Sequence, residues 1–373
     1  MEPRRHVELH QMNEYDLMHF EALGLEARHL EEETAEAQRR KELPEGLRHF
    51  MTPETVQDFL KAHPKAVLPA IITTKTHSVL PDSYLDGDKK SIVTRSAGYD
   101  HLEHLAARAN IVSLREYCVN AVAQTAMKFI YAAAGELNHY TKNTATFERN
   151  KSRAFMEFDW NRIVTVFGVG KIGRRICELA EANGLCVQGV DLRRELLNEQ
   201  YEGKVRFVSK EEAVGTSDIM VNAMNLTRNQ SSPFCNVGYF SREYLSRAKS
   251  GLIFVNVSRG EIAPESVLWE QYSEGRIRGI GLDVFSDEAV LAKALQGGVT
   301  EGADLGADQG AAVTMIEKSL DRSANIYVQP HQAFNSDRAA KTKAAETIKH
   351  LIAWYGSGGQ RFPEQLPYYS QIY

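Results

Sequence analysis

The stretch RIVTVFGVGKIGRRICELAE, residues 162–181, decides how this chain folds. Its β-branched start predicts a buried strand over 162–167, and its amphipathic second half predicts a helix over 171–181. The glycines between them follow the pattern G-x-G-x-x-G, which in this context is typical of a dinucleotide-binding turn. Glycine allows the tight bend, the close approach of a pyrophosphate to free N–H groups, and close helix–strand packing. The residues of the motif expected to bind the cofactor are Gly168, Gly170, Lys171, Ile172 and Gly173.

An acidic residue follows this turn at the expected spacing. Asp191 ends the next predicted strand, about 20 residues after the glycines. Its carboxylate can accept hydrogen bonds from the adenosine ribose hydroxyls of NAD and would repel the 2′-phosphate of NADP. Arg193 and Arg194 follow directly and weaken this discrimination. The sequence therefore predicts an NAD(H) site with a preference over NADP(H).

The pattern of strands and helices extends on both sides of the motif. Strand-like runs alternate with helical segments, which predicts a doubly wound parallel sheet of the Rossmann type between about residues 160 and 330. These runs are residues 187–190, 219–222, 253–257 and 280–284. Elsewhere the patterns predict strands over 66–74 and 91–94, and helices over 16–25, 119–134 and 339–355.

Composition restricts the class of protein. The chain has 373 residues, 43% hydrophobic and 25% charged, with a formal net charge of −5, so it can bury a normal core and has no basic excess for nucleic acid. No apolar run approaches the ~18 residues that cross a bilayer, and the N-terminal segment lacks the apolar stretch of a signal peptide. The four cysteines include no C-x-x-C pair, which predicts neither a metal site nor a disulfide framework and favours the cytoplasm.

Residues 289–325 interrupt the alternation with five glycines and scattered acids. The simpler interpretation is an insertion that forms a surface loop. The alternative is a loop whose residues 296–312 border a ligand pocket. Both interpretations remain open at the level of sequence.

Three strand ends carry polar side chains suited to chemistry. Arg259 lies in NVSRG (256–260), Glu288 ends GLDVFSDE (281–288), and His331 ends QPH (329–331). Because ligands of a doubly wound sheet bind beyond the carboxyl ends of its strands, these side chains are expected to gather near the nucleotide. Each residue alone carries little weight, but the set behind a nucleotide motif predicts an active site.

In the order and spacing of these motifs, from about residue 66 to 355, the chain resembles the D-isomer-specific 2-hydroxyacid dehydrogenases. Tyr117 and the stretch HQAF (331–334) are more similar to the D-lactate dehydrogenase branch of that family than to its phosphoglycerate branch. Upstream, SAGYDHL (96–102) is similar to the family's substrate loop, and YCVNAVAQ (117–124) to the start of its interdomain helix. The resemblance implies a flavodoxin-like α/β substrate domain, residues 1–116 plus 334–373, into which a Rossmann-type NAD-binding domain, residues 117–333, is inserted. It also implies a homodimer, for whose interface the apolar helix over 119–134 is suited if it is not buried within one subunit.

The resemblance also implies a role for each candidate residue. Arg259 would hold the substrate carboxylate with its planar fork, His331 would exchange a proton with the substrate oxygen, and Glu288 would orient the histidine and raise its basicity. Further residues expected to line the cofactor are Asp191, Met224, Asn225, Val257, Ser258 and Asp283. Residues expected to contact the substrate are Ala97, Gly98, Tyr117 and Phe334.

The predicted function is hydride transfer between NAD(H) and C2 of a small 2-oxo or D-2-hydroxy acid similar to lactate. Two alternatives remain open. A formate- or phosphite-type dehydrogenase on the same scaffold would need a smaller pocket. A non-enzymatic NAD(H)-sensing binding protein could keep the same fold and the same residues, because function resides in the site and not in the fold.

Overall fold

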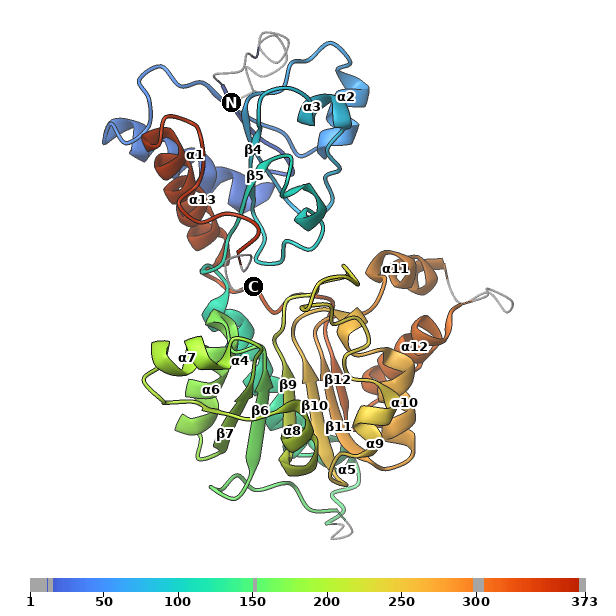
Figure 1. Ribbon diagram of the computed structural model, residues 1–373. Coiled ribbons are helices and arrows are strands. Elements are labelled where there is room, and N and C mark those ends of the chain that lie inside the picture. Colours follow the sequence, from blue (N-terminus) through green and yellow to red (C-terminus); the bar gives the residue numbers. More distant parts are fainter. Residues whose placement is uncertain (1–11, 13–15, 150–152, 298–304, 369–373) are drawn as a thin grey trace. The chain divides into compact units, whose positions relative to one another are not determined.

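The computed structural model describes residue 12 and residues 16–149, 153–297 and 305–368, which form two compact units (Figure 1). The first unit comprises Met1–Cys118 and Asn335–Tyr373, and the second comprises Val119–Phe334. Each unit is built on a parallel β-sheet with helices against it. The predicted α/β fold class is therefore confirmed.

The second unit contains a seven-stranded parallel sheet in the order β12-β11-β10-β9-β6-β7-β8. Its strands are β6 (Ile163–Phe167), β7 (Cys186–Val190), β8 (Arg206–Phe207), β9 (Ile219–Asn222), β10 (Leu252–Asn256), β11 (Ile277–Leu282) and β12 (Ile326–Val328). The direction in which successive strands are added reverses between β6 and β9. In doubly wound sheets, ligands bind beyond the carboxyl ends of the strands at this reversal.

Helices cover both faces of this sheet (Figure 1). The helix α4 (Val119–Ala134) packs with α6 (Lys171–Ala182), and α10 (Glu265–Ser273) packs with α12 (Ala307–Leu320). The approach of α4 requires glycine at Gly281, because a Cβ atom there would lie 2.5 Å from the Cβ atom of Phe129. The other helices are α5 (Leu137–Asn143), α7 (Arg194–Gln200), α8 (Lys210–Thr216), α9 (Arg242–Ser246), the short η3 (Gly260–Ile262) and α11 (Glu288–Gly297).

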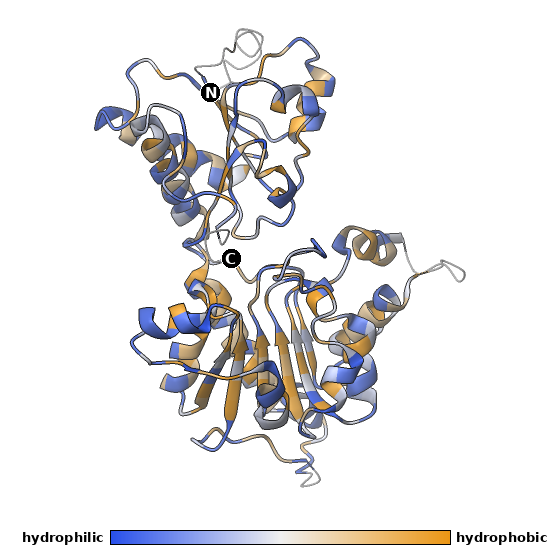
Figure 2. Cartoon of the chain, viewed as in Figure 1, coloured by the Kyte–Doolittle hydropathy of each residue, from blue (hydrophilic) through white to orange (hydrophobic). Residues whose placement is uncertain are grey.

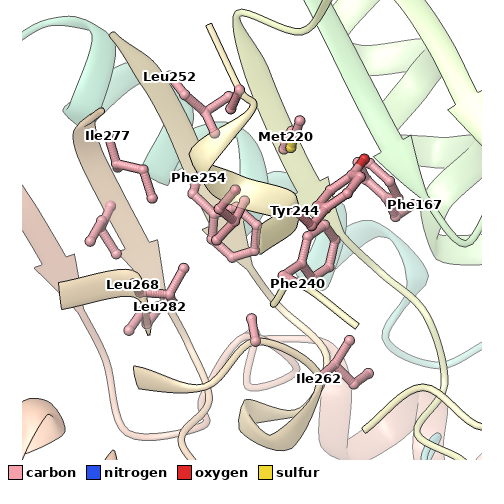
Figure 3. Close-up of a cluster of buried hydrophobic side chains, with 14 of the residues drawn as sticks. Phe167, Met220, Phe240, Tyr244, Leu252, Phe254, Ile262, Leu268, Ile277 and Leu282 are labelled. Atoms are coloured by element: carbon pink, nitrogen blue, oxygen red, sulfur yellow. The ribbon is translucent and has the colours of Figure 1, made fainter. Parts of the chain in front are cut away.

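A buried aromatic cluster holds one side of this sheet. The rings of Phe167 and Phe254 each pack edge-to-face on Phe240, with centroids 4.9 Å apart in both pairs (Figure 3). Figure 2 shows the strands as apolar and many of the surrounding helical surfaces as polar. Close packing of these buried apolar side chains fixes the positions of the strands, and thereby the start of each loop at the strand ends.

The first unit contains a five-stranded parallel sheet in the order β2-β1-β3-β4-β5, which is the strand order of flavodoxin. Its strands are β1 (Leu17–His19), β2 (His49–Met51), β3 (Ile71–Thr74), β4 (Ser91–Thr94) and β5 (Asn110–Ser113). Its helices are α1 (Gly24–Arg39), α2 (Val56–Ala62), α3 (Asp82–Leu85), the short η2 (Glu103–Leu105) and α13 (Ala339–Gly356). Because α1 packs against α13, distant parts of the chain lie side by side. None of the helices in the described ranges is long and apolar enough to cross a membrane.

Two sequence expectations differ from the structure. The helix expected over 16–25 is instead the strand β1 and a turn, and α1 begins only at Gly24. The surface loop expected over 289–325 consists largely of α11 and α12, and residues 298–304 lie outside the described residues. Ala312 and Met315 of α12 belong to the hydrophobic core of the second unit, so this segment is part of the fold.

The apolar helix α4 is mostly buried within its own unit. Ala126 and Ile130 are fully buried, and α4 contacts β10 and β11. Of the two interpretations that the sequence left open for this helix, burial within one subunit accounts for these residues.

Candidate active site

The glycine turn after β6 has the geometry that a pyrophosphate needs. Gly168 has a φ of 82°, and a Cβ atom there would lie 2.7 Å from the backbone of Met224. At Gly173 a Cβ atom would lie 2.0 Å from the carbonyl oxygen of Gly168. At Gly170, by contrast, no atom lies within 4 Å of where a Cβ would stand. The start of α6 is therefore open on the side of Gly170, where its first N–H groups can bind an anion.

Asp191 lies beside this turn, immediately after β7. Its Oδ2 atom accepts a hydrogen bond from the backbone N–H of Val169 at 2.9 Å, so the carboxylate is tied to the glycine turn. Its Oδ1 atom accepts from the backbone N–H of Arg193 at 2.9 Å, and the Arg193 guanidinium lies 3.1 Å from Oδ2. The carboxylate of Asp191 beside the glycine turn fits the ribose of a bound adenosine. The guanidinium of Arg193 is paired with the same carboxylate.

This ion pair predicts how the cofactor preference can be changed. We expect Asp191→Ala to weaken NADH more than NADPH, because the ribose loses its charged acceptor. Arg193→Ala should increase the preference for NADH, because it releases the carboxylate and removes the cation nearest a 2′-phosphate. Loss of a hydrogen bond to a charged group corresponds to about tenfold or more in the ratio of kcat/KM values for the two cofactors. An unchanged ratio in both variants would contradict the role given to Asp191.

His331 and Glu288 form a pair at the carboxyl ends of β12 and β11. The Nδ1 atom of His331 lies 2.9 Å from Oε2 of Glu288, and Oε1 of Glu288 accepts from the backbone N–H of Phe285 at 3.2 Å. Burial alone would raise the pKa of Glu288. The hydrogen bond and charge of His331, the N–H of Phe285 and the charge of Arg259 outweigh burial and hold that pKa below its ordinary value. Glu288 is therefore an anion at neutral pH.

The backbone at this pair is held in an uncommon conformation. His331 has a φ of 51° and Asp287 a φ of 45°, in the left-handed region that non-glycine residues seldom adopt. The N–H of His331 donates to the carbonyl of Asp283 at 2.7 Å. The buried Asp283 carboxylate accepts from the N–H of Gln332 at 2.8 Å and from that of Ala333 at 3.0 Å. Asp283 thus fixes the turn that carries His331, and such local strain clusters at functional sites.

Arg259 follows β10 in the adjacent loop. Its Nη1 atom donates to the carbonyl of Ser258 at 2.9 Å, and its own carbonyl accepts from the Asn256 side chain at 2.9 Å. Asn256 in turn accepts from the side chain of Asn222 at 3.0 Å. This buried amide pair joins the ends of β9 and β10, and the sequence analysis did not assign it a role. The only indication of this pair in the sequence is that an asparagine lies at or next to the end of each of two predicted strands.

The remaining predicted residues divide between the two units. The backbone of Met224 contacts Gly168, its carbonyl accepts from the hydroxyl of Ser258, and the carbonyl of Asn225 accepts from Asn236 at 2.7 Å. The second unit therefore brings together the glycine turn, the strand ends and the Arg259, Glu288 and His331 loops. Phe334 is its last residue, and Val257 directly follows β10.

Ala97 and Gly98 lie in the first unit, in the bend after β4. Tyr117 also belongs to the first unit. Its N–H donates to Glu346 at 2.7 Å, and the ammonium of Lys343 lies 4.8 Å from the centre of its ring. The contact of these three residues with a substrate stays a prediction.

Comparison with known proteins adds three findings. The family model for the NAD-binding domain of D-isomer specific 2-hydroxyacid dehydrogenases matches residues 127–333. The glycerate dehydrogenase of Methylorubrum extorquens is 24% identical over 84% of this chain and 89% of that protein. The D-lactate dehydrogenase of Lactiplantibacillus plantarum is 23% identical over 68% of this chain and 72% of that protein.

The fold is likewise similar to that of solved structures. The crystal structure of a D-lactate dehydrogenase from Aquifex aeolicus, complexed with NAD and lactic acid, superposes with a TM-score of 0.71 and 21% identity. That likeness covers 92% of this chain and 96% of the other. A D-isomer specific 2-hydroxyacid dehydrogenase from Lactobacillus delbrueckii, in its NAD-complexed form, gives the same TM-score at 16% identity, over 92% of this chain and 98% of the other.

Proposed function

Because the chain belongs to the D-isomer specific 2-hydroxyacid dehydrogenase family, whose members are NAD-dependent enzymes, we propose that it reduces small 2-oxo acids similar to pyruvate to D-2-hydroxy acids. The observation that carries this proposal is the pair of His331 and Glu288, 2.9 Å apart, beside the Arg259 loop. The family and its dehydrogenase relatives favour catalysis over the alternative of a binding protein without catalysis.

In the proposed mechanism each of three side chains has one task. The guanidinium of Arg259 binds the substrate carboxylate through two parallel hydrogen bonds, which orients the carbonyl carbon. Bound NADH supplies the hydride. Protonated His331 donates its Nε2 proton to the carbonyl oxygen as negative charge develops there. Glu288 receives the Nδ1–H of His331, which fixes the ring and stabilises its charged form before transfer.

The preference for a lactate-like substrate rests on the solved D-lactate dehydrogenases of similar fold. Other relatives are named for other acids, as is the glycerate dehydrogenase of Methylorubrum extorquens. The group attached to C2 of the substrate is therefore the part that has to be determined by experiment. We propose that the second unit binds NAD. We further propose that the substrate is contacted by Ala97, Gly98, Tyr117 and Phe334.

Steady-state NADH oxidation with a series of substrates tests this proposal. We expect turnover with pyruvate and 2-oxobutyrate, and weaker turnover as the side chain becomes bulkier. Formate or phosphite oxidation with NAD, without activity on any 2-oxo acid, would instead support the alternative of a smaller pocket. Absence of turnover with every compound in both directions would refute the proposal.

Assembly and location complete the proposal. We propose a cytoplasmic homodimer whose interface includes exposed apolar side chains of residues 131–149 and 153–160. Large apolar side chains in these ranges are exposed, among them Phe147 at 77% and Trp160 at 78% of their surface. A contiguous apolar patch at the surface is typical of an interface with another chain, and these side chains are the candidates for such a patch.

The pH dependence of reduction tests the role of Glu288. Reduction needs protonated His331, so its rate should fall as pH rises. Replacing Glu288 by glutamine removes the anion that stabilises the imidazolium, and we expect this limb to move by about one pH unit to lower pH. The measurement is kcat/KM for the 2-oxo acid from pH 5 to 9 in both proteins. An unchanged limb in Glu288→Gln would separate Glu288 from the proton donor.

A further inference from the structure

A second glutamate, Glu265, is buried behind the loops that carry the proposed catalytic residues. It is the first residue of α10, and only 1% of its surface is exposed. Its Oε1 atom accepts a hydrogen bond from the backbone N–H of Ser286 at 2.7 Å. Its Oε2 atom is buried without a hydrogen-bond partner among the described residues. Burying a carboxyl group with so few partners costs free energy, so a specific gain has to offset it.

The residue that Glu265 contacts belongs to the segment of the proposed catalytic pair. Ser286 is followed by Asp287, in its left-handed conformation, and then by Glu288. Glu288 folds back on this segment to accept from the N–H of Phe285. The hydrogen bond from Ser286 to Glu265 therefore fixes the backbone two residues before the carboxylate that holds His331.

The same glutamate is joined closely to the loop of Arg259. Gly260 follows Arg259 directly, and a Cβ atom at this glycine would lie 2.0 Å from the backbone nitrogen of Ser286. Glu265 lies one short helical turn, η3, further along this connection. The connection after β10 and the connection after β11 are thus in backbone contact at Gly260 and hydrogen-bonded at Glu265.

The environment of Glu265 favours its uncharged form. Burial is the main cause that raises its pKa to about 7, the charge of Asp308 adds to it, and the hydrogen bond from the N–H of Ser286 offsets only part. Asp308, at the start of α12, accepts from the N–H and the hydroxyl of Ser266, next to Glu265. At neutral pH the group is therefore far less ionised than an ordinary glutamate, and the geometry assigns its role to the position of its acceptor atom.

From this geometry we propose that Glu265 is a positioning residue, which locks the Arg259 and Glu288 loops together and so sets the place of Glu288 against His331. The inference rests on the proposed function of that pair. Glu265 itself contacts no substrate. A displacement of about 1 Å in a catalytic arrangement can lower a rate by up to about 100-fold, so the effect is measurable.

Three substitutions separate the position of the acceptor from its charge. Glu265→Gln keeps an amide oxygen in the place of Oε1 and should retain kcat within about twofold. Glu265→Asp keeps the carboxyl group but withdraws it by one methylene, and Glu265→Ala removes it. Both should lower kcat by about 10- to 100-fold with little change in NADH binding. The reduction limb should also move to lower pH in these two variants and not in Glu265→Gln.

Glu261→Ala is the matched control, because Glu261 lies in the same connection but is paired with Arg228 at the surface. It should leave kcat and the pH limb unchanged. If Glu265→Asp and Glu265→Ala keep both the rate and the pH limb, Glu265 does not position the pair and the inference is wrong. If both variants lose rate only in proportion to lost folded protein, measured by thermal unfolding, the role is structural and the inference is also wrong.

The failure of this inference can be told apart from failure of the proposed function. The titration of the His331 ring, followed by NMR in the protein without substrate, needs no turnover. We expect its midpoint to move to lower pH in Glu265→Ala and to be restored in Glu265→Gln. This shift in a protein that reduced no 2-oxo acid would support the positioning role and refute only the function. A midpoint that stayed constant in an active enzyme would refute only the positioning role.

Discussion

Replacing His331 by alanine is expected to lower kcat for the reduction of a 2-oxo acid by about 10²- to 10⁴-fold, the range that general acid catalysis contributes. The ring is held through Nδ1 by Glu288, so its Nε2 atom remains to deliver the proton. Binding of NADH should stay within about twofold, because the open N–H groups beside Gly170 and the carboxylate of Asp191 lie on other loops. The two measurements are steady-state kinetics and a fluorescence titration with NADH.

A matched histidine elsewhere in the chain provides the control. His29 of α1 also lies 2.9 Å from a glutamate oxygen, that of Glu32, but on a helix surface of the first unit. His29→Ala should retain full activity. A His331→Ala enzyme that turned over any 2-oxo acid at close to the normal rate would show that another group supplies the proton.

The second unit could be predicted well because local and long-range signals agree there. The strands expected at 187–190 and 219–222 correspond to β7 and β9, and the glycine turn lies between β6 and α6. Each strand is a short, mainly apolar run between turn residues. Gly168 and Gly173 have a steric reason in the turn itself, and Gly170 leaves the start of α6 open. A fold can be predicted from sequence where local propensity, hydrophobic pattern and turn residues agree, as they do here.

The first unit was harder for a physical reason. The three residues of β1 are all fully buried, so they show no alternation of apolar and polar side chains. Their apolar neighbours Phe20 and Leu23 then imitate helical spacing. The segment 289–325 was predicted as a loop because of its glycines. Gly310 nevertheless lies inside α12, where the packing of Ala312 and Met315 in the core offsets the helix-destabilising effect of glycine.

The roles of the supporting residues of the site could not be predicted for another reason. Glu265, Asn222 and Asn256 act through hydrogen bonds between separate strands and loops, and sequence spacing does not record such contacts. Asp283 was predicted as a cofactor residue from the motif. In the structure its carboxylate is occupied by backbone N–H groups of the His331 turn. Residue types at strand ends can thus be read from the sequence, whereas the hydrogen bonds that orient them require the fold.

Arg259 provides the second large effect, on substrate binding. Arg259→Ala should raise KM for the 2-oxo acid and lower kcat/KM by about 100-fold or more, because a charge-assisted pair of hydrogen bonds is lost and the carbonyl is no longer oriented. Arg259→Lys should recover little, since an ammonium group cannot form two parallel hydrogen bonds to a carboxylate. Binding of NADH should be unchanged in both variants.

The contrast with His331 makes the assignment of Arg259 testable. Loss of the proton donor should lower kcat, whereas loss of the carboxylate partner should act mainly on KM, so the two variants should have different kinetic signatures. Arg242→Lys is a suitable control, because Arg242 is an exposed arginine paired with Glu270 on the surface of the second unit. The carboxylate would have to bind elsewhere if Arg259→Lys kept the normal KM. That result would also refute the proposed orientation of the substrate against His331.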